Sequence, residues 1–122
     1  MLTMRVFLVE DSPLLRSRLE GMVAAIPGAQ NGGHASGAQQ AIQAILAQQP
    51  EAVVLDIHLD QGNGFDVLKA LQQAAAPSAV FVLTNYPNEA YRRKAQALGA
   101  RGFFDKSSEL DGLRAALAAA AA

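Results

Sequence analysis

Five polar side chains with complementary chemistry stand at the ends of short apolar runs. They are Glu10 and Asp11, then Asp56, Thr84 and Lys106. Three carboxylates suit a hard divalent cation, while a hydroxyl and an amine suit the oxygens of a phosphoryl group. The residue types alone therefore indicate a site for magnesium and phosphoryl chemistry.

The apolar runs that precede these side chains predict buried strands. The runs are Val6–Val9, Ala52–Leu55, Val80–Leu83 and Gly102–Asp105. Short apolar runs bounded by polar or turn residues are typical of parallel strands buried on both faces. In an open parallel sheet, the ligand site lies just beyond the carboxyl ends of the strands. We therefore expect the five polar side chains to share one pocket.

Segments with helical spacing separate these runs, and a polar residue that can act as an N-cap precedes most of them. The expected caps are Ser12, Ser36, Asn88 and either Ser107 or Ser108. A further strand is expected near residues 30–35, although its asparagine and glycines are poor strand formers. Five strand–helix units predict an α/β fold, with a parallel sheet covered by helices on both faces.

Composition limits the classes of function. The 122 residues suit a single domain, 1–122, and the net charge of −1 does not favour nucleic-acid binding. The chain has no cysteine and two histidines, which excludes thiolate chemistry and disfavours a multi-histidine metal site. No apolar stretch reaches membrane-spanning length, and the first residues lack a signal-peptide pattern, so a cytoplasmic location is expected.

Each candidate side chain also has an ordinary structural role to offer. Asp56 could cap the turn that follows its strand, Thr84 could satisfy only the backbone, and Lys106 could simply pair with an aspartate. Taken together the set is more informative, because carboxylates at one sheet edge repel each other unless a cation neutralises them. Oxygen ligands without histidine or cysteine favour Mg²⁺.

The chain resembles a bacterial response-regulator receiver domain over essentially its whole length. The segments that carry the resemblance are Val9–Ser12, Val54–Leu59, Gly64–Leu68, Val82–Thr84 and Leu98–Lys106. The resemblance implies a flavodoxin-like, doubly wound sheet of five parallel strands in the order 2-1-3-4-5, flanked by five helices.

The resemblance also implies a role for each acidic residue. Asp56 would be the phosphoacceptor and would attack the phosphorus of a phosphohistidine on a sensor histidine kinase or histidine phosphotransfer protein. Asp11, Asp56 and the backbone carbonyl of His58 would bind Mg²⁺, and Glu10 would act through a metal-bound water. The domain would phosphorylate and dephosphorylate itself but would not be an enzyme that turns over a metabolite.

Thr84 and Lys106 would hold phosphoryl oxygens, and Thr84 together with Phe103 would form the switch. Plain core packing is the competing role for Phe103. Because phenylalanine lacks a hydroxyl, we expect burial alone to separate its two rotamers. Ser107 replaces the proline that often follows the lysine in the family, and the peptide bond before it is expected to be trans. His58 and Tyr86 either flank the path of the hydrolytic water or are solvent-facing loop residues.

Two other functions remain open from the sequence. A receiver-like interaction module that no longer needs phosphate is one, although the intact polar set argues against it. A Mg²⁺-dependent phosphohydrolase is the other, but a haloacid-dehalogenase-like enzyme would carry a second aspartate where this chain has His58. A homodimer is possible, and neither direct nucleic-acid binding nor membrane association is expected.

Overall fold

Strand and helix alternate five times along the chain in this computed structural model, which describes residues 3–122. Met1 and Leu2, the start of the expected domain, lie outside the described residues. The strands are β1 (Met4–Val9), β2 (Ala29–Ala35), β3 (Ala52–Asp56), β4 (Ala79–Thr84) and β5 (Gly102–Asp105). The helices are α1 (Pro13–Ala24), α2 (Ala38–Gln48), α3 (Gly64–Gln73), α4 (Glu89–Ala97) and α5 (Leu110–Ala121). All strand pairs are parallel, in the order β2-β1-β3-β4-β5, which confirms the expected fold.

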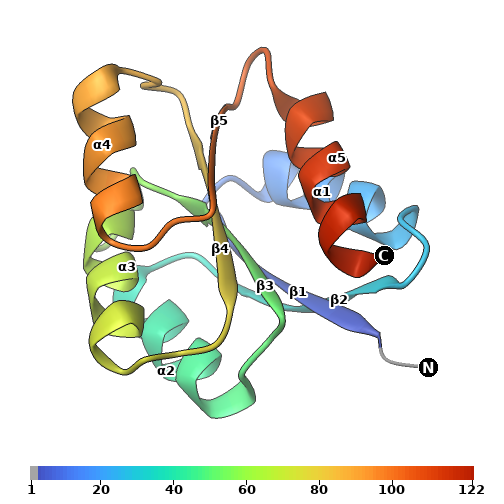
Figure 1. Ribbon diagram of the computed structural model, residues 1–122, viewed down its shortest axis with the longest axis horizontal. Helices are drawn as coiled ribbons and strands as arrows, with labels where there is room; N and C mark the ends of the chain where they lie inside the picture. Colours follow the sequence, from blue (N-terminus) through green and yellow to red (C-terminus); the bar gives the residue numbers. More distant parts are fainter. Residues whose placement is uncertain (1–2) are drawn as a thin grey trace.

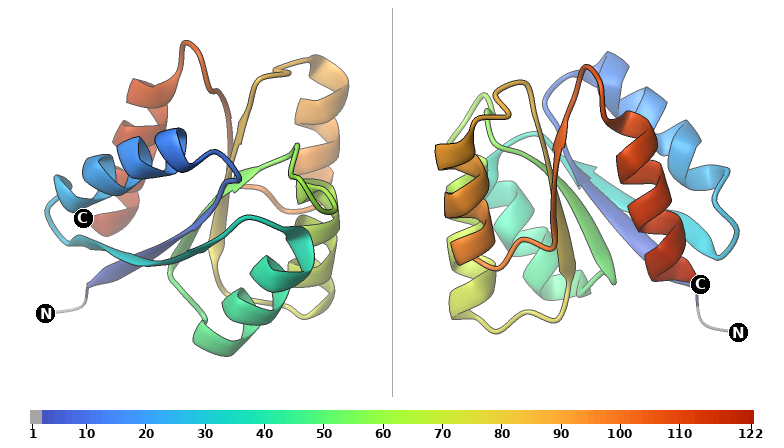
Figure 2. Two further views of the ribbon diagram at one scale, coloured as in Figure 1. Left: turned by 180° about the vertical axis from the view of Figure 1, so that it is seen from behind. Right: turned by 45° about the horizontal axis from the view of Figure 1, so that its top comes forward.

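Two hydrophobic layers hold the sheet between helices. Helices α1 and α5 pack on one face, and α2, α3 and α4 pack on the other (Figures 1 and 2). Alternate residues of a central strand feed opposite layers: Val53 and Leu55 belong to the α2–α4 side, and Val54 belongs to the α1–α5 side. This period of two explains why the central strands are apolar throughout.

Two of the expected helix caps are confirmed. The backbone N–H of Leu15 donates to Ser12 Oγ at 3.3 Å, with Pro13 as the first residue of α1. The N–H of Tyr91 donates to Asn88 Oδ1 at 2.8 Å at the start of α4. Both caps supply an acceptor for a backbone donor that the helix itself leaves unpaired.

The cap predicted at Ser36 is wrong. Gly37 is the N-cap of α2 and provides no side-chain acceptor. Instead the N–H of Ala38 donates to the backbone carbonyl of Gln61 at 2.9 Å. The acceptor therefore comes from a loop 23 residues further along the chain and not, as the sequence predicted, from the neighbouring Ser36.

The cap predicted at Ser107 or Ser108 is also wrong. Glu109 is the N-cap of α5, and both serine hydroxyls donate instead to the Asp105 carboxylate. The serines therefore order the loop before the helix.

The glycines that weaken β2 as a strand lie at an irregularity in its pairing with β1. The register moves from Val6 opposite Asn31 to Leu8 opposite His34, so β2 carries one extra residue there. Gly33 has a φ of +120°, and a Cβ at this position would lie 3.2 Å from the Phe7 ring. Such a bulge needs a residue that tolerates positive φ and leaves room for the neighbouring side chain.

A polar cluster ties the start of β1 to the connection between α2 and β3. Arg5 donates to the Glu51 carboxylate from its backbone N–H at 2.7 Å and from its guanidinium at 2.9 and 3.1 Å. The same guanidinium donates to the carbonyls of Gln48 and Gln49 at 3.1 and 2.8 Å. Chiefly through the side-chain hydrogen bond from Arg5, the pKa of Glu51 falls to about 2.

We predict that Glu51→Gln lowers stability at neutral pH but not in strong acid. A folded-state pKa below the unfolded one gives a contribution that is present above about pH 4.5 and is lost as the pH falls toward 2. Because both side chains are partly exposed, the loss at pH 7 should stay below about 1 kcal/mol. Urea unfolding of wild type and variant at pH 7 and pH 3 should show the difference shrinking.

Glu20→Gln provides the control, because no ion pair involves Glu20 among residues 3–122. A difference for Glu51→Gln that stays constant from pH 7 to pH 3 would contradict the ion-pair explanation.

Candidate functional site

Three carboxylates meet at the carboxyl edge of the sheet, as the sequence predicted. Glu10 and Asp11 follow β1, and Asp56 is the last residue of β3. Each offers an oxygen within 4.8 Å of the others. The parallel register that sets Val9 opposite Leu55 brings the residues that follow them together. Glu10 and Asp56 are 2% and 3% exposed, so two of the three acids are nearly removed from water.

Lys106 reaches this cluster from the end of β5. Its Nζ lies 2.9 Å from Glu10 Oε1 and donates a hydrogen bond to Asp56 Oδ2 at 2.8 Å. Its backbone N–H donates to the Thr84 carbonyl at 2.9 Å, which fixes the start of the side chain. Lys106 therefore joins the ends of three strands through one ammonium group.

Backbone donors complete the binding of two of the carboxylates. The N–H of Ser12 donates to Glu10 Oε2 at 3.1 Å, and the N–H of His58 donates to Asp56 Oδ1 at 3.1 Å. Glu10 Oε1 is paired by charge with Lys106, but the angle is unsuited to a hydrogen bond. A buried oxygen with remaining acceptor capacity is therefore present in the cluster.

Burial and pairing act in opposite directions on the two partners of the central ion pair. Burial raises the pKa of Asp56, and the hydrogen bond and charge of Lys106 only partly offset that rise. Burial lowers the pKa of Lys106, but its hydrogen bond to Asp56 and its charge interactions with Asp56 and Glu10 outweigh burial and leave the pKa raised. Lys106 is therefore protonated at neutral pH. Its positive charge does not fully offset the cost of burying the Asp56 carboxylate in its ionised form.

Thr84 ends β4 and is fully buried at the same edge. Its hydroxyl accepts a hydrogen bond from the backbone N–H of Tyr86 at 3.0 Å. In this structure the hydroxyl therefore satisfies the backbone, which was the ordinary role considered for it. The register sets Thr84 opposite Asp105, the residue before Lys106, so the hydroxyl and the amine arise from adjacent strand ends.

Phe103 is buried on β5 and packs in the α2–α4 layer. It lies opposite Val82, two residues before Thr84, so both switch candidates face the same side of the sheet. The Arg92 guanidinium lies 4.8 Å from the ring centroid, so burial is not the only interaction of this rotamer; that burial alone separates two rotamers stays a prediction. A cation–π contact from α4 adds to burial.

His58 and Tyr86 are exposed loop residues, and their rings contact each other. Their ring centroids lie 4.5 Å apart, and the His58 ring also stacks with Tyr91 at 5.8 Å. Tyr91 in turn meets the Phe65 ring edge-on at 5.4 Å. An aromatic chain therefore links the loop after Asp56 to both α4 and α3.

Asp60 is a fourth acid beside the cluster, and it was not among the residues predicted for the site. A hydrogen bond to the Asp11 carboxyl, together with the negative charge of that group, raises the pKa of Asp60. Its place in the loop after β3, four residues beyond Asp56, was the available signal. The loop has no periodicity, so its direction could not be read from the sequence.

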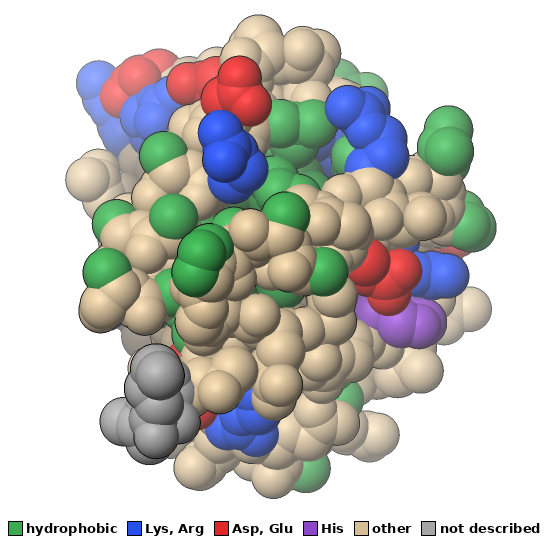
Figure 3. All heavy atoms as spheres, turned by 90° about the vertical axis from the view of Figure 1, so that its right-hand side faces the viewer, with side chains coloured by type: hydrophobic (Ala, Val, Ile, Leu, Met, Phe, Trp, Pro, Cys, Tyr) green, Lys and Arg blue, Asp and Glu red, His purple; other side chains and the backbone are tan. Residues whose placement is uncertain are grey.

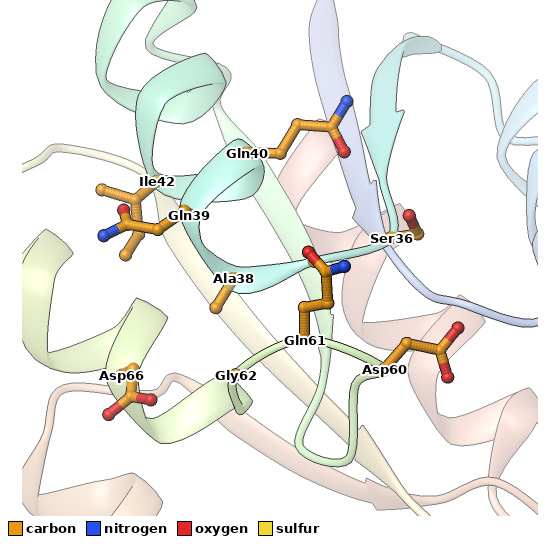
Figure 4. Close-up of a pocket in the computed structure, with 10 residues that line it drawn as sticks. Ser36, Ala38, Gln39, Gln40, Ile42, Asp60, Gln61, Gly62 and Asp66 are labelled. Carbon is orange, nitrogen blue, oxygen red and sulfur yellow. The ribbon is translucent and has the colours of Figure 1, made fainter.

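A cavity of about 450 Å³ borders this loop. It lies between the start of α2 and residues 60–66, and its polar lining includes Gln39, Gln40 and Gln61 (Figure 4). In Figure 4 the Asp60 carboxylate points away from the middle of the cavity. Of the acids at the site, only Asp60 lines this cavity, so the cavity and the acidic cluster are neighbours with separate linings.

Gly64 allows the start of α3 to lie against the backbone of the central aspartate. A Cβ at Gly64 would clash with the Asp56 carbonyl oxygen and would lie 2.9 Å from Ile57 Cα. The N–H of Gly64 donates to the Ile57 carbonyl at 2.8 Å. A side chain at this position would have to move backbone atoms, which adjust less readily than a flexible side chain.

We predict that Gly64→Ala destabilises the protein by on the order of 1–3 kcal/mol, because the added methyl group overpacks the backbone of β3. Urea unfolding measures the change. Gly21→Ala is the matched control: Gly21 lies in α1 with nothing within 4 Å of its Cβ position, and alanine there should stabilise by about 0.5–1 kcal/mol. Equal effects at the two glycines would contradict the close-approach argument.

The donor set fits a divalent cation. The Lys106 ammonium is one positive charge beside a cluster of three carboxylates, and the Asp60 carboxylate lies next to that cluster. Glu10 Oε1 can still accept a hydrogen bond or bind a cation. Hard oxygen ligands of this kind suit Mg²⁺, which commonly takes one or two carboxylates and retains waters. A cation here would relieve the repulsion that the sheet imposes on these acids.

Comparison with known proteins places this geometry in a large group of signalling proteins. The family model of the response regulator receiver domain matches residues 6–118. A protein-glutamate methylesterase/protein-glutamine glutaminase of Anaeromyxobacter dehalogenans is 33% identical over 85% of this chain and 30% of its own length. The DNA-binding transcriptional activator DevR/DosR of Mycobacterium tuberculosis is 29% identical over 84% of the chain and 47% of its own length.

Solved structures agree with this assignment. A two-component response regulator of the LuxR family from Aurantimonas sp. is 27% identical, with a TM-score of 0.90, over 98% of this chain and 85% of that one. The response regulator domain of Thermotoga maritima CheB, at 24% identity and a TM-score of 0.85 over 98% and 93%, shares the fold.

Two further properties concern the charges on the surface and the hydropathy of the helices. On the face formed around the right-hand side of Figure 1, basic and acidic side chains occur in small mixed groups (Figure 3). Among the described residues, no helix has the length and apolar character needed to cross a membrane.

Proposed function

Because this chain belongs to the response regulator receiver domain family of two-component systems, in which an aspartate is phosphorylated, we propose that Asp56 is its phosphoacceptor. The observation that carries this assignment is the position of the Asp56 carboxylate. It lies within the acidic cluster, with Lys106 on Oδ2 and the His58 N–H on Oδ1. The raised pKa of this buried group favours the arrival of further positive charge.

The proposed reaction is phosphoryl transfer from a phosphohistidine. An Asp56 oxygen attacks the phosphorus, a P–O bond forms as the P–N bond breaks, and the departing imidazole nitrogen keeps the electron pair. Transfer of this kind depends mainly on positioning and on neutralising the charge of the phosphoryl oxygens. Lys106, already oriented by the Asp56 and Glu10 carboxylates, supplies one positive group at that position.

Asp11, Asp56 and the backbone carbonyl of His58 are the proposed ligands of Mg²⁺, with Glu10 acting through a water. When bound, the ion supplies positive charge for the phosphoryl oxygens and neutralises the acids. The chain's own contribution is to hold the acids in place: Ser12 N–H orients Glu10, and Lys106 pairs with two of the carboxylates.

Thr84 and Phe103 are the proposed switch. The Thr84 hydroxyl accepts only a hydrogen bond from a loop N–H, so it can turn toward a new phosphoryl oxygen at the cost of that bond. Phe103 faces the same side of the sheet and contacts Arg92 on α4. Movement of the hydroxyl would change the packing beside the ring and so reach the surface of α4.

The proposed partners and setting follow from this chemistry. The donor is a sensor histidine kinase or a histidine phosphotransfer protein in the cytoplasm, and the reader of the switch is an output domain or a separate protein. Residues 1–122 would form the receiver unit, which can pair with a second copy and turns over no metabolite. The chain spans less than half the length of the two curated relatives compared above.

The competing functions lack support at the site. The hydrolase would need an acid two residues after Asp56, where the chain has His58 with its ring against Tyr86. A module that does not bind phosphate would not require a buried lysine that pairs with both Glu10 and Asp56, as Lys106 does. The assembled polar set favours the phosphorylated switch over both.

We predict that incubation with Mg²⁺ and acetyl phosphate adds one phosphoryl group to the wild-type protein. Intact-mass measurement should detect the adduct, and hydroxylamine should remove it, as expected of an acyl phosphate. Asp56→Asn should abolish the adduct, because an amide cannot serve as the nucleophile. Asp66→Asn, which changes an exposed aspartate in the first turn of α3, should leave labelling unchanged.

An unlabelled wild-type protein, or an adduct that persists in Asp56→Asn, would overturn the assignment. Sustained release of phosphate from a monoester would favour the hydrolase.

We predict that Mg²⁺ stabilises the folded protein through Asp11. Stabilisation should grow with the logarithm of the Mg²⁺ concentration and reach about 2.7 kcal/mol at a hundred times Kd. Without the ion, Asp11→Asn should raise stability, since it removes repulsion from Asp56 and Asp60; with the ion, the gain should disappear. Thermal unfolding with and without Mg²⁺ measures both effects.

Asp111→Asn serves as the control, because Asp111 is an exposed aspartate on α5. Its response to Mg²⁺ should equal that of the wild-type protein. A full Mg²⁺ response in Asp11→Asn would remove this residue from the proposed metal site.

A further inference from the structure

The loop between β5 and α5 holds Lys106 without the proline that often follows this lysine in the family. No cis peptide bond occurs among the described residues, so the Lys106–Ser107 bond is trans, as expected. The loop joins β5 to α5 at the top of Figure 1. Because Ser107 has a free φ and a backbone donor, the conformation of this loop must be set by contacts.

The carboxylate of Asp105 makes those contacts. Its Oδ1 accepts the Ser107 backbone N–H and the Ser107 hydroxyl, each at 2.8 Å, and its Oδ2 accepts the Ser108 hydroxyl at 3.1 Å. Three hydrogen bonds therefore close a turn around Lys106, which lies between the acceptor residue and the donors. Short side-chain turns of this kind let an aspartate fix the backbone two residues ahead.

The same residue connects the turn to the sheet and to the last helix. Asp105 lies opposite Thr84 in the β4–β5 pair. Its backbone N–H donates to Glu109 Oε1 at 3.0 Å, and the Glu109 N–H donates to the Asp105 carbonyl at 2.9 Å. The backbone on both sides of Lys106 is thus anchored, by β4 before it and by the turn and α5 after it.

We propose that Asp105 is a positioning residue that holds the Lys106 ammonium at Asp56 by closing the turn on Ser107 and Ser108. The inference rests on the proposed function of Asp56 and Lys106. Asp105 does not touch the acidic cluster through any contact among the described residues, so it acts through Lys106.

The chemistry of the turn suits this role. The hydrogen bond from the Ser107 N–H, followed by that from its hydroxyl, lowers the pKa of Asp105. The carboxylate is therefore ionised at neutral pH and remains an acceptor for all three donors. Lys106 has a long, flexible stem, and fixing the backbone at its base removes much of the freedom that would move Nζ away from Asp56.

The first test measures the exposure of Lys106 directly. Limited acetylation without Mg²⁺, followed by peptide mass spectrometry, compares the reaction rate of Lys106 with that of exposed Lys69 in the same molecule. Asp105→Ala should raise the relative rate several-fold, since the ammonium would leave its pocket more often. Asp105→Asn keeps a carbonyl acceptor for the Ser107 N–H and should restore most of the protection.

The second test measures the consequence for phosphorylation. With Mg²⁺ and acetyl phosphate, Asp105→Ala should slow the labelling of Asp56 by about tenfold or more, because misplacement of a charge-neutralising group by an ångström can cost up to about a hundredfold. Asp105→Asn should recover most of the rate. Asp111→Ala, which removes an equal charge from the first turn of α5, should match the wild-type protein in both tests.

The outcomes separate positioning from charge and from misfolding. If Asp105→Ala leaves Lys106 protected, or if Asp105→Asn or Asp111→Ala exposes Lys106 as much as Asp105→Ala does, the proposal is overturned. If Asp105→Ala fails to fold by circular dichroism, Ser107→Ala decides instead: it removes one of the three bonds and should expose Lys106 to a smaller degree, and unchanged protection would overturn the proposal. The acetylation test does not require phosphorylation, so failure of the wild-type protein to be labelled would reject the proposed function alone.

Discussion

One ammonium group carries the electrostatic balance of this protein. Lys106 pairs with Glu10 and Asp56, two carboxylates that the parallel sheet buries side by side. Removing one partner of a buried pair typically costs 3–5 kcal/mol, because the charge that remains is uncompensated. The site is therefore stable only while positive charge is present, and the same demand for positive charge makes it suited to a metal ion and to phosphoryl chemistry.

Two glycines allow close approaches in the fold that carries this site. Gly64 brings the start of α3 against the backbone at Asp56, and Gly33 lets β2 bulge around the Phe7 ring. At both positions a side chain would prevent the close contact, and glycine permits it although glycine loses more conformational freedom on folding than other residues. The first places a helix directly behind the central acid, and the second keeps an irregular edge strand in register with β1.

Two consecutive residues on α4 connect that helix to the site by different routes. Tyr91 stacks with His58, which follows Asp56 by two residues, and Arg92 lies over Phe103, which precedes Lys106 by three. The position of α4 thus depends on the loop after β3 and on β5 together. An event at the acidic cluster that moves either partner changes the packing of the same helix, which gives a local change of charge a path to the surface.

The sequence by itself determined the four apolar strands and the five polar side chains at their ends, because apolar runs that end in polar residues record burial and strand direction locally. It also determined the caps at Ser12 and Asn88, whose donors lie three residues away. Tertiary structure decided which groups pair. The Gln61 carbonyl accepts the hydrogen bond at the start of α2 that was expected to go to Ser36. Ser107 and Ser108 bond to Asp105 and do not cap α5. Asp60 forms a hydrogen bond with Asp11. Lys106 reaches an acid 50 positions away. These partners depend on which loops and strand ends lie close together in the folded protein, and the local propensities of a sequence do not determine such long-range contacts.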